Sequence, residues 1–253
     1  MITQTRAVVL RSMKYNDTSK IVRMFTEECG KVAVIAKGAR SARSPFGSSL
    51  EVMGVVDAVF YRKEDRELHF LSRCETVLPL PGIVTDMGRL QSALSIVELT
   101  DAVTPPEEPA RHMFTALLET LQVVNSATNN HLVALYSFES RVLHLLGFKP
   151  EMMHCTRCGR IAAEDGSGRV ALSPEGVLCE QCGRSVAGAP SVRSMTRKAL
   201  HLLQQEMPEP LVRGAGWDPP VLREVGRTLD WYLRLHVHGF RGLKSDAVFA
   251  AIQ

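Results

Sequence analysis

Short apolar runs rich in Val, Ile, Phe and Tyr recur between polar segments along the first 80 residues, which is the pattern of short β-strands. Turn-forming residues separate the runs, and one long connection covers residues 37–50. The predicted strands are residues 5–10, 20–25, 31–36, 52–61 and 68–72, with a hairpin tip at 63–66. Five short antiparallel strands with one long connection favour a small OB-type barrel, and an SH3-like barrel is the structural alternative.

Beyond Pro79 and Pro81 the apolar residues recur at helical spacing, and we interpret these stripes as core. Acidic residues at 107–108 and Pro109 favour a helix start there, Gly147 is a predicted C-cap, and the proline-rich residues 207–220 are predicted to be a loop. The predicted helices are residues 86–103, 107 to about 124, 130–146, 194–205 and 219–236.

The fold class is therefore α+β, with a barrel domain at residues 1–80 and a helical bundle domain at 81–253 that contains a cysteine-rich module at about 150–190. The composition, 45% hydrophobic and 23% charged residues in a chain of 253, excludes a disordered, collagen-like or rod-like protein. No apolar run approaches the roughly 18 residues that span a bilayer, and the start of the chain lacks a signal-peptide pattern. We expect a cytoplasmic protein with reduced cysteines.

Charge is distributed unevenly along the chain, although the net charge is only +3. Residues 1–80 hold 13 Lys and Arg against 9 Asp and Glu, whereas residues 81–150 hold 4 against 7. Residues 29–50 contain no acidic residue, and the cations in that window are Lys31, Lys37, Arg40 and Arg43. Because attraction to phosphate depends on local fields, this window indicates either a phosphate-binding surface or a solvated basic loop.

Two CxxC pairs, separated by 20 residues, are the strongest chemical signal. The four cysteines are Cys155, Cys158, Cys179 and Cys182. Two such knuckles complete a tetrahedral thiolate site that suits one Zn²⁺ ion, and four protein ligands make the ion structural. Gly159 and Gly183 follow the pairs, and left-handed backbone is expected at both. Two disulfides or a redox dithiol are the alternatives.

Three other residues near this chemistry have more ordinary interpretations. His154 is a substitute metal ligand or, by preference, a cap or surface histidine. Cys29 and Cys74 have no partner spacing and are predicted to be buried or half-buried free thiols. The sequence carries no phosphate-binding loop, HExxH, GxSxG or zinc-deaminase motif. Binding or scaffolding is therefore favoured over catalysis.

Several segments in order resemble the RecO family of bacterial recombination mediators. They are residues 17–20 (DTSK), 30–40 (GKVAVIAKGAR), 46–51 (FGSSLE) and 138–148 (FESRVLHLLGF), then Pro150, His154-Cys155 and residues 243–245 (LKS). The resemblance implies a non-catalytic mediator in DNA repair with an N-terminal OB-fold that binds single- and double-stranded DNA and anneals strands. It further implies work with RecR, often with RecF, contact with the acidic tail of single-stranded DNA-binding protein, and loading of RecA.

The candidate DNA contacts follow from that implication. They are Lys31, Lys37, Arg40, Arg43, Arg11, Lys14 and Phe46. Phe46 or Tyr15 offers a stacking face, and Phe46 is equally well interpreted as a loop anchor. Arg193, Arg197 and Lys198 extend the basic surface or, by preference, form a solvated helix face. The rival functions are a zinc-ribbon and OB factor that acts on RNA, and a metal-dependent nuclease or hydrolase.

Overall fold

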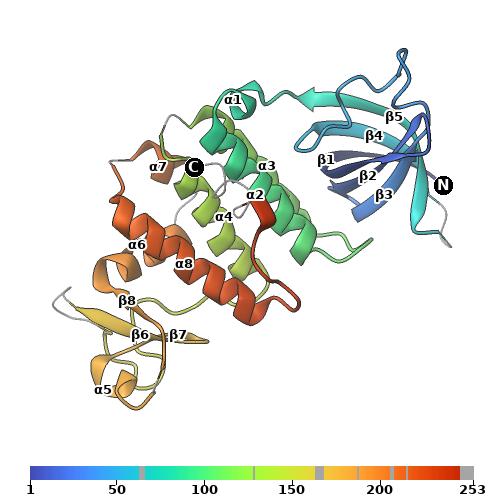
Figure 1. Cartoon of the computed structure of the whole chain (residues 1–253). Helices are drawn as coiled ribbons and strands as arrows, with labels where there is room; N and C mark the ends of the chain where they lie inside the picture. The colour runs from blue at the N-terminus through green and yellow to red at the C-terminus, as the bar shows by residue number, and fades with distance from the viewer. Residues whose placement is uncertain are drawn as a thin grey trace. The chain divides into compact units, whose positions relative to one another are not determined.

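The computed structural model describes residues 1–62, 66–127, 129–162, 168–186, 188–205, 208–214 and 216–245 (Figure 1). The chain divides into two compact units, one formed by Met1–Ser126 with Leu243–Gln253 and the other by Ala127–Gly242. Within the described helices, none has both the length and the apolar character that crossing a membrane requires.

Five strands at the N-terminus close into a barrel in the order β1-β2-β3-β5-β4. They are β1 (Ile2–Tyr15), β2 (Ser19–Thr26), β3 (Gly30–Ala36), β4 (Val55–Tyr61) and β5 (Leu68–Leu78). The pair β3–β5 is parallel and the other pairs are antiparallel. This is the OB-type arrangement, so that prediction is confirmed and the SH3-like alternative is not adopted. Residues 63–65 of the predicted hairpin tip lie outside the described residues.

The barrel core is made by alternate residues of each strand, as the period-2 pattern requires. Along β3 the burial alternates strictly, with Val32 and Val34 inside and the residues between them half-buried. Cys29 and Cys74 belong to this core and are free thiols, as predicted. Burial, with a smaller contribution from Glu75, raises the pKa of the Cys74 thiol to about 12. Both sulfurs therefore act as small apolar groups.

Three helices complete the first unit: α1 (Pro81–Val84), α2 (Met87–Val103) and α3 (Arg111–Ser126). Asp86 caps α2, because its carboxylate accepts a hydrogen bond from the Arg89 N–H at 2.9 Å. The predicted start of α3 at residue 107 is wrong. Glu107 has a φ of +56°, outside the helical region, and its carboxylate accepts a hydrogen bond from Arg62 at 2.6 Å.

The second unit combines helices with a small sheet. The helices are α4 (His131–Leu145), α6 (Ser194–Gln205), α7 (Pro208–Arg213) and α8 (Pro219–His236). Gly147, at a φ of +86°, follows α4 as the predicted C-cap. The loop predicted at 207–220 is partly wrong, because α7 lies within it. Proline is tolerated in a first helical turn, where its missing N–H is not needed.

The cysteine module contains β6 (Arg169–Ser173), β7 (Gly176–Leu178), the short helix α5 (Glu180–Gly183) and β8 (Ser191–Arg193). Its sheet has the order β7-β6-β8. Helix α8 holds this sheet through the buried Glu224, whose carboxylate contacts Arg169 at 3.0 Å and Arg193 at 2.9 Å. The Tyr232 hydroxyl donates to the Ser173 carbonyl at 3.2 Å.

Electrostatics reinforce this attachment. Burial raises the pKa of Glu224, but hydrogen bonds from Thr196, Arg193 and Arg169 outweigh that effect and lower the pKa to about 2. Arg197, one of the residues predicted on a solvated helix face, is 1% exposed, and its guanidinium donates to the Met152 carbonyl at 2.7 Å. Neither interpretation of Arg197 holds, because its charge is used inside the unit.

Candidate metal centre and nucleic-acid interface

The sulfur atoms of Cys155, Cys158, Cys179 and Cys182 all lie within 4.8 Å of one another. Those of Cys158 and Cys179 are 3.7 Å apart. Four sulfurs around a metal at about 2.3 Å would be separated by about 3.8 Å. The two CxxC pairs therefore meet in a cluster with the dimensions of a four-thiolate metal site.

Local backbone geometry presents each pair to the cluster. Gly159 follows the first pair at a φ of +74°, as predicted, and its N–H donates to the Cys155 carbonyl at 2.9 Å. Gly183 differs from the prediction, because it is helical and ends α5. A Cβ there would lie 3.0 Å from the Ala171 side chain, so a close approach to β6 accounts for this glycine.

The protonation chemistry of the thiols fits a bound cation. Burial raises the pKa of Cys155, but backbone N–H groups of Cys179, Cys158 and Arg157 outweigh it and lower the pKa to about 6. Burial and hydrogen bonds with the other thiols raise the pKa of Cys182 to about 12. Four neighbouring thiols resist full ionisation, whereas a divalent cation stabilises four thiolates together. The four cysteines could therefore hold a metal ion.

His154 lies outside this cluster. Its side chain is 57% exposed, and its Nδ1 atom is 3.7 Å from the Glu151 carboxylate. It is thus a surface histidine, which was the preferred interpretation.

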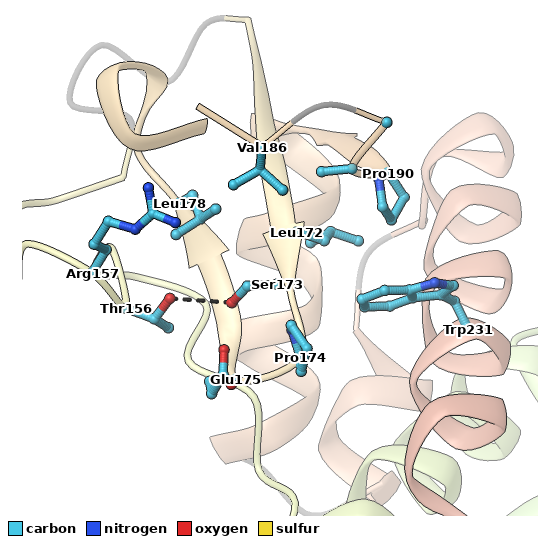
Figure 2. Close-up of a pocket in the computed structure, with 12 residues that line it drawn as sticks. Thr156, Arg157, Leu172, Ser173, Pro174, Glu175, Leu178, Val186, Pro190 and Trp231 are labelled. Carbon is cyan, nitrogen blue, oxygen red and sulfur yellow. Dashed lines mark hydrogen bonds between the residues drawn. The ribbon is translucent and has the colours of Figure 1, made fainter. Parts of the chain in front are cut away.

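A cavity of about 550 Å³ lies between the cysteine module and α8 (Figure 2). The Trp231 indole projects from α8 towards Leu172 and Pro190, and the Thr156 and Ser173 hydroxyls, 3.1 Å apart, lie on the opposite side. The ionisable side chains of its described lining are Arg157 and Glu175. These residues offer packing surface and do not form a recognisable catalytic constellation.

On the barrel, the structure brings the long connection against the turn between β1 and β2. The backbone N–H of Arg40 donates to the Thr18 carbonyl at 2.9 Å, and its guanidinium donates to the Asn16 carbonyl at 2.9 Å. Arg11 and Lys14 lie on β1 before this turn, and both are exposed. Arg40 and Lys14 are therefore at the same end of the barrel.

The connection itself is ordered by successive turns and by one apolar anchor. Phe46 is 5% exposed and belongs to the barrel core, so the loop-anchor interpretation describes it and its ring has no free face for a base. Lys37 and Arg43 remain exposed on the same connection. The candidate interface of this segment therefore consists of Lys37, Arg40 and Arg43.

Lys31 is placed differently from the other predicted cations. Its ammonium is 3.3 Å from the Asp101 carboxylate and donates to the Asp101 carbonyl at 2.6 Å. Arg23 pairs with the same carboxylate at 2.8 Å. Asp101 thus pairs with both cations and joins α2 to the barrel, and contact between Lys31 and DNA remains a prediction.

Two aromatic residues that the sequence reasoning did not single out are Phe70, which lies beside Lys37, and its neighbour Tyr61. The Lys37 ammonium is 5.7 Å from the centre of the Phe70 ring, and Tyr61 is the cross-strand neighbour of Phe70. Both aromatic side chains are exposed. Neighbouring residues of a strand point to opposite faces, so the burial of His69 places Phe70 on the outer face of β5.

Two family models match the chain. The model described as "Recombination protein O N terminal" matches residues 1–80, and "Recombination protein O C terminal" matches residues 84–247. The DNA repair protein RecO of Chloroherpeton thalassium is 29% identical over 256 residues, which cover 98% of each chain. That of Salinibacter ruber is 40% identical over 126 residues, 50% of this chain and 48% of the relative. That of Chlorobaculum parvum is 35% identical over 155 residues, 61% and 60%.

Proposed function

The chain belongs to the RecO family of DNA repair proteins, and on that basis we propose that it is a non-catalytic mediator of DNA recombination. It binds single- and double-stranded DNA, promotes annealing of complementary strands, and assists the loading of RecA on single strands coated by single-stranded DNA-binding protein. RecR and RecF are its proposed partners, together with the acidic tail of single-stranded DNA-binding protein. The proposed location is the cytoplasm, in association with the nucleoid.

The observation that carries the DNA-binding part is the acid-free segment at one end of the barrel. Lys37, Arg40 and Arg43 occur there without a neighbouring carboxylate in the sequence, and Phe46 anchors the segment in the core. A cationic surface on a rigid barrel attracts phosphate of any sequence. Arg11 and Lys14 extend the proposed surface along β1.

The metal ion of the four-cysteine cluster is proposed to be one structural Zn²⁺. All four ligands are thiolates and no position is left for a substrate, which is typical of structural zinc. We also propose a barrel domain at residues 1–80 and a helical domain at 81–253. The separate family models support that division, although α1, α2 and α3 pack in the same compact unit as the barrel.

The DNA interface is tested by removing charge from the segment without disturbing its anchor. The variant Lys37→Gln/Arg43→Gln should bind a single-stranded oligonucleotide more weakly, and the slope of log affinity against log salt should flatten by about 0.7 per lost contact. The control Lys149→Gln/Arg227→Gln removes the same charge from exposed positions in the other unit. Equal slopes for the two variants would remove the segment from the interface.

A further inference from the structure

A row of apolar residues runs from strand to strand across the outer face of the barrel. Strand pairing places its members directly opposite one another, from β1 through β2, β3, β5 and β4 and back to the start of β1. The row consists of Met13, Ile21, Ile35, Phe70, Tyr61 and Ile2. Because paired residues point to the same side of a sheet, the six side chains share the outer surface.

The two aromatic members of this row are neighbours, and both are exposed. Tyr61 is 45% exposed and Phe70 is 39% exposed. Their ring centres are 6.0 Å apart at an angle of 35°, and the Lys37 ammonium lies 5.7 Å from the Phe70 ring. An aromatic pair with an adjacent cation is the combination that holds a stacked base and its phosphate.

Among the residues that the structure describes, packing within the unit leaves most of the row exposed and Ile21 and Ile35 half-buried. The outer faces of β2 and β3 contact α2 further along the strands, where Arg23 and Lys31 reach Asp101. Within the row, Met13 and Ile2 are exposed, as are the two aromatic residues. A contiguous apolar row on a protein surface indicates a binding surface.

The charges around the row indicate the chemistry of its ligand. Lys14 follows Met13 on β1, Arg11 precedes it by two residues, and Lys37 follows Ile35 by two residues. All three cations are exposed. From Lys37 the chain continues into the acid-free segment, so the aromatic pair and the proposed phosphate contacts form one surface. A polyanion with flat apolar groups fits this surface.

We propose that Tyr61 and Phe70 form a stacking platform for the bases of single-stranded DNA. The proposal rests on the proposed DNA-binding function and adds to it the group that is recognised, namely an unstacked base. Bases inside a duplex have no free face, so the platform acts on single strands, and every base has a π-face, so it tolerates any sequence. Lys37 contacts the neighbouring phosphate.

The test compares two oligonucleotides of equal length and charge, an oligothymidylate and its abasic counterpart. The wild-type protein should bind the thymidylate more tightly, by about 5- to 150-fold for each stacked base. Tyr61→Leu/Phe70→Leu should bind both oligonucleotides with the affinity of the abasic one and keep the salt slope. Phe148→Leu, an exposed aromatic of the other unit, is the matched control and should behave as wild type.

Each outcome decides a separate point. If the wild-type protein binds neither oligonucleotide, the proposed function fails. If it binds both equally, or if Tyr61→Leu/Phe70→Leu keeps the preference for thymidylate, DNA binding stands and the platform is overturned in favour of another partner for this face. The single variant Phe70→Tyr retains an aromatic ring and should therefore keep the preference for thymidylate over the abasic oligonucleotide. Its failure to do so, with an unchanged melting temperature, would also overturn the platform.

Discussion

The barrel encloses a core that draws side chains from all five strands, whereas the cluster of buried residues around the metal-site cysteines consists of Cys155, Cys179 and Leu178. In the barrel, apolar burial and a closed hydrogen-bond ladder hold the fold together. In the cysteine module, two residues that would bind the metal make up most of the small buried cluster around the site. We therefore expect the barrel to stay folded without the metal, and the module to depend on the metal and on its attachment to α8.

Metal removal should produce the largest difference in stability between the barrel and the cysteine module. Structural zinc contributes about 10 kcal/mol of apparent binding free energy in small zinc domains, so a chelator or Cys155→Ser should unfold the module and leave the barrel folded. Hydrogen exchange followed segment by segment measures this difference. The module should lose protection over β6 and β7, while β2 and β3 keep it.

Cys29→Ala is the control for that experiment, because Cys29 is a buried cysteine of the barrel and lies outside the cluster. Its response to chelator should equal that of the wild-type protein. Equal protection of β6 and β7 with and without metal would show that the module is self-sufficient too, and the contrast with the barrel would be lost.

Truncation of the barrel core should have the next largest effect. Phe46→Ala removes an aromatic ring that is 5% exposed, and such changes cost about 3–5 kcal/mol of unfolding free energy. Denaturant titration measures the loss, which should be the same with and without chelator. A loss below about 0.5 kcal/mol would show that Phe46 does not anchor the long connection.

The sequence predicted those parts of the two regions that depend on local order. The CxxC spacing places all four cysteines of the metal site in two short segments, and the apolar run at 31–36 predicts β3 before any partner is known. Lys31 and Phe46 were different, because a partner 70 residues away and a position in a closed core are fixed by the tertiary fold. The apolar row likewise exists only through the strand register.

The attachment of the module to α8 should depend on pH through Glu224. Its pKa is lowered in the folded protein from 4.5 to about 2. The stabilisation is therefore complete above about pH 4.5 and is lost as the pH falls towards 2. The stabilisation by ionised Glu224 is about 3 kcal/mol. Glu224→Gln should lower the unfolding free energy of the second unit at pH 7, and the difference from wild type should shrink in acid. A difference that stays constant from pH 7 to pH 3 would contradict this account.

The smallest effect is expected at two lysines that the sequence could not distinguish. Lys31 and Lys37 flank the same strand in the same acid-free window, but only the first is held by Asp101. Lys31→Gln should lower the unfolding free energy by about 1 kcal/mol and change the salt slope of DNA binding less than Lys37→Gln does, because the Lys31 ammonium is already paired with Asp101. Lys37→Gln should do the reverse, with a stability change below about 0.5 kcal/mol and a slope flattened by about 0.7. If Lys31→Gln flattens the slope equally, DNA must displace Asp101, and the contact between α2 and the barrel would then change on binding.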